Sequence, residues 1–336
     1  MNNTTRTVYH SLLTRLGELN GVADVTKTFA VDPSVQQKLE TKMQESSEFL
    51  GKINIIGVTE KEGEKLKLGI SGPVASRTDT NKSERQPRDL TELGDDKYRC
   101  VKTNFDTHIP YAKLDAWAKF ADFQTRIRDV ILRRQALDRM VIGFHGASVA
   151  DTSDIATYPL LQDVNKGWLQ NMREHAPQRV MGSGQTAGTV SVGAGAGSDY
   201  ANLDAAVFDA ITLLDPWFRD DTGLVVMVGR ELMHDKYFPL VNQKQSHVET
   251  LAADVVISQK RIGGLQAVSV PYFPANAFLI TRFDNLSIYF QDGARRRQVV
   301  ENPKRDRIEN YESSNDAYVI EDYGMAALVE HVELVN

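Results

Sequence analysis

The chain has 336 residues, of which 41% are hydrophobic and 25% charged, and its net charge is -6. This length predicts about two domains of a globular protein, and the acidic balance argues against a general nucleic-acid binder, which is usually basic. The single cysteine, Cys100, excludes an intrachain disulfide framework and a cysteine zinc site. The sequence contains neither a signal-peptide pattern nor an apolar run of the roughly 18 residues that a membrane helix needs, so we expect cytoplasmic synthesis and no membrane partner.

The first fifty residues predict two amphipathic helices joined by a polar linker. Apolar residues recur at helical spacing over 7–19. A second helix is predicted over about 34–50, with Pro33 and Ser34 at capping positions. Neither helix can bury its apolar face alone, so residues 1–52 are interpreted as an arm rather than a domain.

The segment from Thr59 to Tyr98 is the most unusual part of the chain. Of its 40 residues, 17 are charged, and two strand-like runs, 53–58 and 65–70, lead into it, with Gly63 predicted as a turn. Such a hairpin has no core of its own to offset the entropy of ordering it. We therefore expect it to lie on another molecule, in the first place a second copy of the chain.

The strongest helical pattern follows, from about Lys113 to Ile142. Apolar side chains recur at three- and four-residue steps, and basic side chains occupy the other face. One continuous helix of this length would span about 45 Å, which is typical of a spine. Gly143 and Gly146 are predicted to end it.

Helices and strands alternate from about 150 to 284. The apolar run LVVMV predicts a central sheet covered on both faces. Helices are predicted at 160–175, 202–214 and 230–241, and strands at 224–228, 255–258, 267–270 and 278–281. The tail predicts strands at 286–290, 295–300, 305–311 and 317–320, and a last segment at 324–335.

The motifs of common enzymes are missing. The glycine-rich segment 182–197 lacks the Gly-Lys-Ser/Thr end of a phosphate-binding loop, so we interpret it as an exposed hairpin. The histidines do not form a helical zinc motif, and no Gly-x-Ser-x-Gly elbow is present. The basic cluster at 295–297 is interleaved with acids and is interpreted as a solvated or intersubunit face. We therefore expect no catalytic residue, metal or cofactor.

Several long stretches resemble the major capsid proteins of P2-type temperate tailed phages, and the similarity runs from about Leu12 to Val335. These stretches are MQESSEFLGKINIIGV, SERQPRDL, DFQTRIRDVILRRQALD, LAADVVISQKRIGGLQAV, VPYFPANAFLIT, LSIYF and ENPKRDRIENYESSNDAYVIEDY. The resemblance implies an α+β chain with the tailed-phage capsid fold of the Hong Kong 97 type. It divides the chain into an N-terminal arm (1–52), an extended loop (53–108), a peripheral domain with the spine helix (109–149), an axial domain (150–284) and peripheral strands with the C-terminus (285–336).

The resemblance also implies a function. Pentamers and hexamers of one subunit would build an icosahedral shell around double-stranded DNA, which the shell would contact weakly and without sequence preference. The extended loop would then contact a neighbouring subunit. The charged candidates for these contacts are Glu60, Lys61, Glu62, Glu64, Lys65 and Lys67 on its first half and Arg77, Glu84, Arg85, Arg88 and Asp89 on its second.

Further partners follow from the same resemblance. They are the portal protein and an internal scaffolding protein that is also a protease. The protease would remove about residues 1–29 inside the procapsid, with the cut between Phe29 and Ala30, since proteases need extended, exposed backbone. The protein would be part of the virion and would assemble in the cytoplasm of the host bacterium.

Two other interpretations remain open from the residues alone. A cytosolic α/β enzyme would use the alternating elements at 150–284, and it predicts a polar constellation at the strand ends that the sequence does not show. An adaptor or scaffold-binding protein would form a discrete oligomer rather than closed shells. Intersubunit crosslinks between lysine and asparagine occur in some relatives of the fold, but the sequence identifies no carboxylate to catalyse them.

Overall fold

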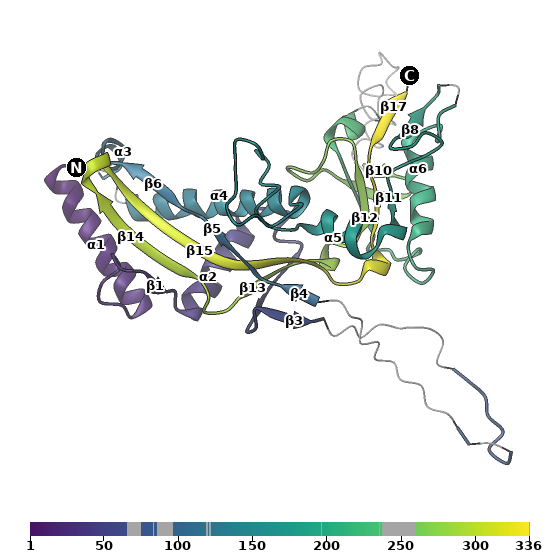
Figure 1. The fold of residues 1–336 in the computed structure, drawn as a ribbon, viewed down its shortest axis with the longest axis horizontal. Coiled ribbons are helices and arrows are strands. Elements are labelled where there is room, and N and C mark those ends of the chain that lie inside the picture. The colour runs from purple at the N-terminus through teal and green to yellow at the C-terminus, as the bar shows by residue number, and fades with distance from the viewer. Residues whose placement is uncertain are drawn as a thin grey trace, which may run out of the picture.

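The computed structural model describes residues 1–65, 75–82, 84–85, 97–118, 120, 122–195, 197–234, 236 and 260–335. Within this part of the chain, two sheets of seven and six strands form an elongated body. A hairpin projects from the body, and its described tip lies well beyond it (Figure 1).

The N-terminal part of the chain supplies α1 (Asn3–Asn20), β1 (Phe29–Ala30), α2 (Pro33–Glu45), β2 (Asn54–Val58), β3 (Glu62–Glu64), β4 (Lys97–Arg99), β5 (Val101–Asn104), β6 (Thr107–Pro110), α3 (Tyr111–Trp117) and α4 (Phe123–His145). The middle supplies α5 (Trp168–His175), η1 (Pro177–Arg179), β7 (Val180–Met181), β8 (Val190–Gly193), α6 (Leu203–Ala210), η2 (Ile211–Leu213), β9 (Val225–Val228), β10 (Arg261–Ile262), β11 (Leu265–Val268) and β12 (Phe278–Thr281). The last part supplies η3 (Phe283–Asn285), β13 (Leu286–Gln291), β14 (Arg296–Asn302), η4 (Pro303–Arg305), β15 (Arg307–Ile320), η5 (Tyr323–Met325), β16 (Ala327–Val329) and β17 (Val332–Val335).

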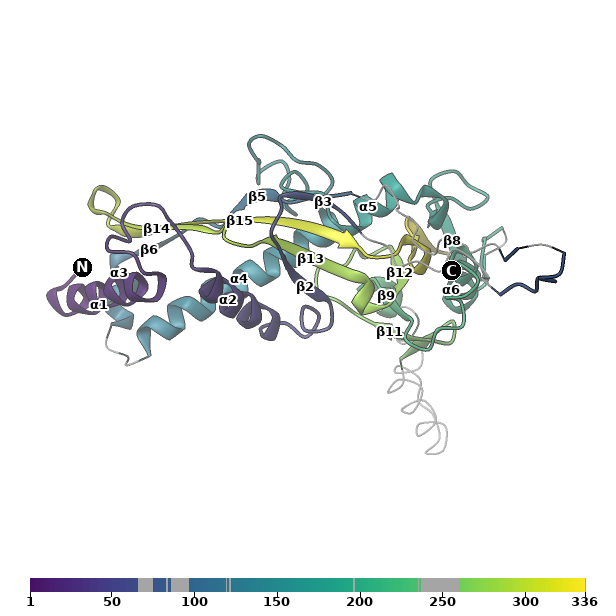
Figure 2. The ribbon, with the colours of Figure 1, turned by 90° about the horizontal axis from the view of Figure 1, so that it is seen from below.

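The seven-stranded sheet is built around β15, which is 14 residues long. Its order is β1-β14-β15-β13-β2, and β5 and β6 pair with β15 as well. The helix α4 runs along this sheet (Figure 2). Two separate strands, 305–311 and 317–320, are predicted here. That prediction is wrong, since Glu312, Ser314 and Asp316 are buried within one strand and have polar partners.

The six-stranded sheet has the order β10-β11-β9-β12-β16-β7. All four residues of β9 are buried. Val226 and Val228 face a core that includes α6, whereas Val225 and Met227 face the largest core of the molecule. This confirms the predicted sheet with two covered faces. Strands β16 and β17, at the end of the chain, pair with β12 and β8, outside the seven-stranded sheet.

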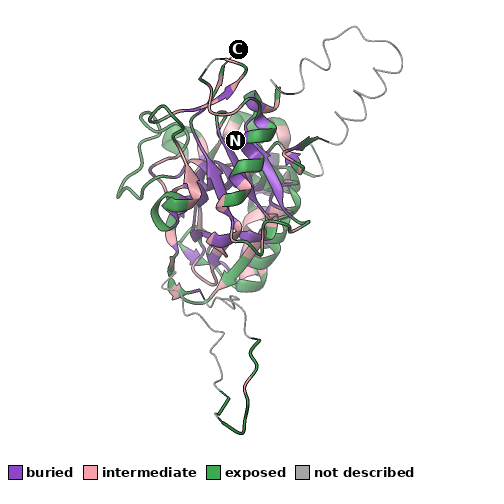
Figure 3. Cartoon of the chain, turned by 90° about the vertical axis from the view of Figure 1, so that its right-hand side faces the viewer, coloured by how far each residue is buried: buried purple, intermediate pink, exposed green. Residues whose placement is uncertain are grey.

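The largest core joins the two sheets. It contains Ile288 and Tyr318 of the seven-stranded sheet and Met227 and Leu279 of the six-stranded sheet. Trp168 packs among them with its ring edge-on to Tyr318, at a centroid distance of 5.4 Å. Figure 3 shows these buried residues as a continuous interior, with exposed residues on the helices and on the tip of the hairpin.

The N-terminal helices are confirmed, with different ends. In α1 the Asn2 side chain accepts a hydrogen bond from Thr5 N at 2.8 Å, and Gly21 ends the helix in the left-handed conformation. In α2 the capping residue is Asp32, with Pro33 in the first turn. The helix stops at Glu45 rather than near residue 50, because serines follow and the Ser46 hydroxyl bonds back to the Met43 carbonyl at 2.7 Å.

The predicted continuous spine helix is wrong. It consists of α3 and α4, and Asp122 lies at the N-terminal end of α4, where its carboxylate pairs with Arg126 at 2.7 Å. Aspartate is a poor helix-interior residue and is favoured at helix N-termini. Gly146 does follow the last turn, but Gly143 lies inside α4. A Cβ there would come within 2.2 Å of the Trp168 ring, so Gly143 makes room for this ring rather than ending the helix.

Two turn predictions also differ from the structure. Gly63 is in β3, opposite Tyr98 of β4. The glycine-rich segment 182–197 contains β8, which pairs in parallel with β17 and buries Val190 and Val192 in the core under α6. The predicted strand at 255–258, part of the run at 65–70 and part of the helix at 230–241 lie outside the described residues.

Candidate assembly surfaces

The base of the hairpin is held together by its own charges. Glu62 pairs with Arg99 at 3.0 Å, and Glu64 pairs with Lys97 at 3.7 Å, across the antiparallel strands β3 and β4. These two glutamates therefore have partners within the subunit. Glu60 and Lys61 are exposed just before β3.

Lys65 anchors the hairpin to the body. Its side chain is buried, and its Nζ donates to the Ile320 carbonyl at 2.6 Å and lies 4.9 Å from the centre of the Tyr323 ring. It was expected to contact a neighbouring subunit, whereas the structure gives it a role inside its own subunit. Lys65 follows directly after β3, and its side chain reaches the C-terminal end of β15. There the Ile320 carbonyl accepts its hydrogen bond.

Three further candidates lie on the described part of the hairpin beyond its base. Arg77, Glu84 and Arg85 are exposed, and the described tip lies away from the body (Figure 1). Lys67, Arg88 and Asp89 lie outside the described residues. The charged side chains of Arg77, Glu84 and Arg85 are thus exposed to solvent in the single subunit.

The predicted processing position is in β1. This strand pairs antiparallel with β14, with Phe29 opposite Arg297 and Ala30 opposite Arg296. An exposed linker was expected, but the Phe29 side chain is only 6% exposed, because it packs with Val25 and Val31 in a small apolar cluster. The backbone is extended as expected, Ala30 is exposed, and β1 is at the edge of its sheet.

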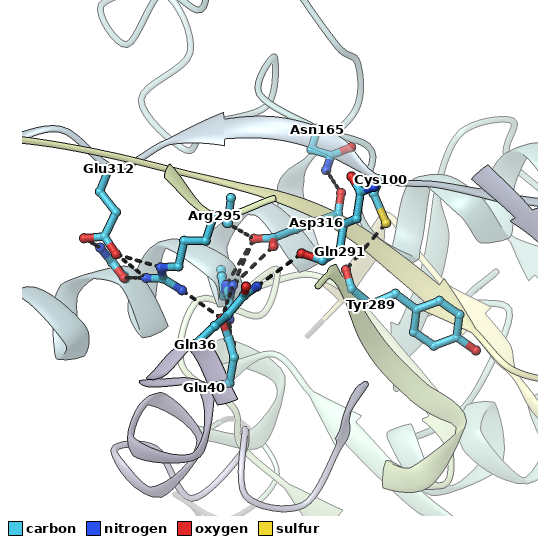
Figure 4. Close-up of polar contacts among 12 residues, drawn as sticks. Gln36, Glu40, Cys100, Asn165, Tyr289, Gln291, Arg295, Glu312 and Asp316 are labelled. Carbon is cyan, nitrogen blue, oxygen red and sulfur yellow. Dashed lines mark hydrogen bonds and ion pairs between the residues drawn. The ribbon is translucent and has the colours of Figure 1, made fainter. Parts of the chain in front are cut away.

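A buried charge cluster fixes the second half of the arm. It consists of Glu40 from α2, Arg139 from α4, Arg295 from the segment just before β14, and Glu312 and Asp316 from β15. Figure 4 shows Glu40, Arg295, Glu312 and Asp316 near one another. None of the five side chains is more than 4% exposed. Their contacts join segments that are far apart in the sequence.

Glu40 lies between the two arginines. Its carboxylate accepts from Arg295 Nη1 at 2.8 Å and from Arg139 Nη2 at 3.2 Å, and Arg139 Nη1 makes a further ion pair with it. The carboxylate thus contacts two buried guanidinium groups at once. It ties α2 to the spine helix and to the sheet.

The acids of β15 complete the pairing. Arg295 Nε donates to Glu312 at 2.7 Å, and Arg139 Nε donates to Asp316 at 3.2 Å. Burial would raise the pKa of Glu312, but Arg295 and Arg297 lower it to about 2. Burial dominates at Asp316 and raises the pKa of its carboxyl, although Arg139 opposes the shift.

This cluster was missed in the sequence, where the basic residues at 295–297 were interpreted as a solvated or intersubunit face. Arg296 is exposed, but Arg295 is 1% exposed and has three acceptors in its own subunit. One usable signal is Arg139, which occupies the apolar side of its helix next to Met140. An arginine there implies buried acidic partners.

The described residues contain no group of three or more His, Cys, Asp or Glu side chains arranged to hold a metal ion. No helix in the described ranges is long and apolar enough to cross a membrane. Cys100 is fully buried, and burial raises the pKa of its thiol to about 12, so this thiol is protonated and inert at neutral pH.

Comparison with known proteins identifies the family. The model of the phage major capsid protein, P2 family, matches residues 8–332. The capsid proteins of Escherichia phage P2 are 52% identical over 343 residues, covering 99% of this chain and 96% of theirs. The major capsid protein of Serratia phage KSP20 is 40% identical over 344 residues, covering 99% and 97%.

Solved structures agree with the sequence matches. A chain of the satellite phage P4 procapsid, which includes the size determination protein, has a TM-score of 0.83 at 49% identity, covering 100% of this chain and 99% of that one. The capsid of an empty GTA particle has a TM-score of 0.53 at 14% identity, covering 86% and 90%, and shows the fold alone.

These matches confirm the predicted α+β tailed-phage capsid fold of the Hong Kong 97 type and a structural, non-enzymatic role. The interpretations as a cytosolic enzyme and as an adaptor are wrong. By sequence and by fold, this chain belongs to the P2 family of phage major capsid proteins and forms the shell of a phage particle.

Proposed function

We propose that the subunit assembles into pentamers and hexamers of a closed icosahedral shell around double-stranded DNA, with its hairpin lying on a neighbouring copy. The observation that carries the proposal is the hairpin itself. Its described tip, residues 75–82, lies away from the body and has almost only exposed side chains (Figure 3). A projecting segment of this kind needs a surface to cover it, because its own contacts do not offset the entropy of ordering it.

Within this proposal, the charged side chains of the hairpin divide into two groups. Glu62, Glu64 and Lys65 stabilise its base inside the subunit. Glu60, Lys61, Arg77, Glu84 and Arg85 are exposed and available to a neighbour. Charge pairs of this kind set the register of an interface more than its affinity.

We further propose that maturation removes about residues 1–29. The contacts on either side of the cut support this position. The segment before the cut packs through small satellite clusters around Tyr9 and Phe29 and through the edge strand β1. The segment after the cut is held by the buried charge cluster through Glu40 and by Met43 and Leu50 in the largest core. A cut between Phe29 and Ala30 would therefore leave α2 in place.

The proposed partners are an internal scaffolding protein that also acts as the protease, the portal protein and the packaged DNA. Assembly would take place in the cytoplasm of the host bacterium. The net charge of -6 is consistent with weak, nonspecific contact between the subunit and DNA.

The test is co-expression of the full chain with its scaffolding protease, followed by electron microscopy and intact mass of the same sample. We expect closed shells whose subunit is lighter by the first 29 residues. Closed shells with a full-length subunit would refute the proposed processing. Small oligomers in the presence of an active protease would refute shell assembly by the chain and its scaffolding protease.

A hairpin variant tests the proposed contact directly. Glu64 is opposite Lys97 in the register of β3 and β4, so replacing residues 66–96 by Asn-Gly would close the base with a short turn. We expect this variant to fold and to form no closed shells. Closed shells of normal size from the variant would show that the hairpin is not needed for assembly.

A further inference from the structure

A groove lies between the base of the hairpin and the body. Its volume is about 940 Å³, and it is bounded by β4 and β5 on one side and by residues 148–151 and α5 on the other. Figure 2 shows β3, β5 and α5 along the same side of the molecule. The groove's lining includes Lys65, Lys97 and Arg99, whose contacts at the base of the hairpin are described above.

The lining of the groove is rich in cations. It includes Lys61, Lys65, Lys97, Arg99, Lys102 and Lys166, and the described residues that line it provide two carboxylates, those of Asp151 and Glu174. Six basic side chains around one groove attract carboxylates or other anions.

Most of these cations are already neutralised or bonded within the subunit. Lys97 and Arg99 pair with the glutamates of β3, and Lys166 pairs with Glu174 at 2.7 Å. Lys65 donates to a carbonyl. Lys61 and Lys102 are different, because both are exposed and neither has a carboxylate within ion-pair distance among the described residues.

Apolar groups lie beside the two lysines. Val149, on the far wall, is 46% exposed, and Tyr98 and Val101 contribute to the near wall. The near wall is well supported, because β5 pairs with β15 and Cys100 packs against Ala317 and Val319 beneath it. A surface with two free ammonium groups, apolar neighbours and a strand-supported wall suits a protein segment that carries carboxylates.

We propose that this groove receives a carboxylate-bearing segment of a second copy of the chain, with Lys61 and Lys102 as its ion-pair donors. The inference rests on the proposed assembly and names a receiving surface for it. Self-association is established for the family, and the chain has 45 acidic against 39 basic residues, so a neighbouring copy offers an excess of carboxylates. Asp220 and Glu231, for example, are exposed and have no ion pair among the described residues.

Zero-length crosslinking tests the proposal. A carbodiimide joins a lysine amine to a carboxylate only when the two are in contact. Shells assembled from an equal mixture of ¹⁴N- and ¹⁵N-labelled chains would be treated, digested and analysed by mass spectrometry. We expect Lys61 and Lys102 in mixed-isotope peptides joined to an Asp or Glu of the other copy.

Two results would overturn the inference while leaving shell assembly intact. One is that shells form but both lysines crosslink only within a single-isotope chain or not at all. The other is that the two lysines become protected from acetylation only when DNA is packaged, which would make nucleic acid the occupant. Absence of shells in the unmodified mixture would instead count against the proposed function.

Charge reversal supplies a second readout. We expect the double variant Lys61→Glu/Lys102→Glu to lower the yield of closed shells at least tenfold at low salt. The control is Lys113→Glu, at an exposed lysine of α3 for which the described residues provide no ion pair, and it should assemble normally. Near-ultraviolet circular dichroism of the unassembled double variant would show that it is folded. Normal yield from a folded double variant would contradict the proposal.

Discussion

Replacing Glu40 by glutamine is expected to destabilise the subunit. The change keeps the shape of the side chain but removes the carboxylate that contacts both Arg139 and Arg295, while Asp316 still pairs with Arg139 and Glu312 with Arg295. A buried hydrogen bond to a charged group typically contributes about 1.5–3 kcal/mol. We expect a loss of this size in the free energy of unfolding.

Urea unfolding of the full chain, followed by tryptophan fluorescence, to which the buried Trp168 contributes, measures this loss. With a denaturant slope of about 3 kcal/mol per molar, the midpoint should fall by about 0.5–1 M. The matched control is Glu45→Gln on the same helix, because Glu45 pairs with Lys42 at the surface at 2.7 Å. Exposed pairs contribute less than about 1 kcal/mol. Equal midpoints for the two variants would refute the stabilising role of the buried charge cluster.

Three further outcomes are expected. Gly143→Ala should lower the midpoint of thermal unfolding by several degrees, because the new Cβ would lie 2.2 Å from the Trp168 ring. The control Gly51→Ala should not lower it, because the nearest atom to its new Cβ is the Ser47 carbonyl oxygen at 3.5 Å. Tyr9→Phe should leave the free energy of unfolding in urea unchanged or raise it by about 1 kcal/mol, since the buried Tyr9 hydroxyl has no hydrogen-bond partner in the described residues. A decrease of more than about 1 kcal/mol would show that the hydroxyl does have a partner. The low pKa of Glu312, about 2 against 4.5 when unfolded, means that its contribution of about 3 kcal/mol is complete above pH 4.5 and is lost as the pH falls towards 2. Glu312→Gln should remove that part of the acid dependence in urea titrations between pH 2 and 5.

Local patterns were sufficient to predict much of the fold. The apolar run of β9 correctly indicated a strand buried on both faces, and the helical spacing over 7–19 correctly indicated α1, although the cap at Asn2 starts this helix earlier than predicted. These signals are local, since they depend on side-chain periodicity and on the caps of single helices.

Contacts between distant segments were not predictable in this way. The ion pairs of Glu40 join residues 99 and 255 positions apart, and no periodic pattern encodes such pairing. The same holds for Glu312 and Asp316 of β15, whose ion-pair partners Arg295 and Arg139 lie on other segments. The exposed charges of the hairpin remain candidates, since their complement would be on another molecule.

The core that joins the two sheets has a mechanical consequence. Ile288 and Met227 belong to different sheets but to the same packed interior. Asn285 hydrogen-bonds to both the backbone N–H and the carbonyl of Asp322, where the chain crosses back from the seven-stranded to the six-stranded sheet. Bending the body at this junction would open a close-packed core. The body should therefore move as one stiff plate. A shell built from such plates has to adjust its curvature by rotating whole subunits against one another, at the contacts between them rather than within them.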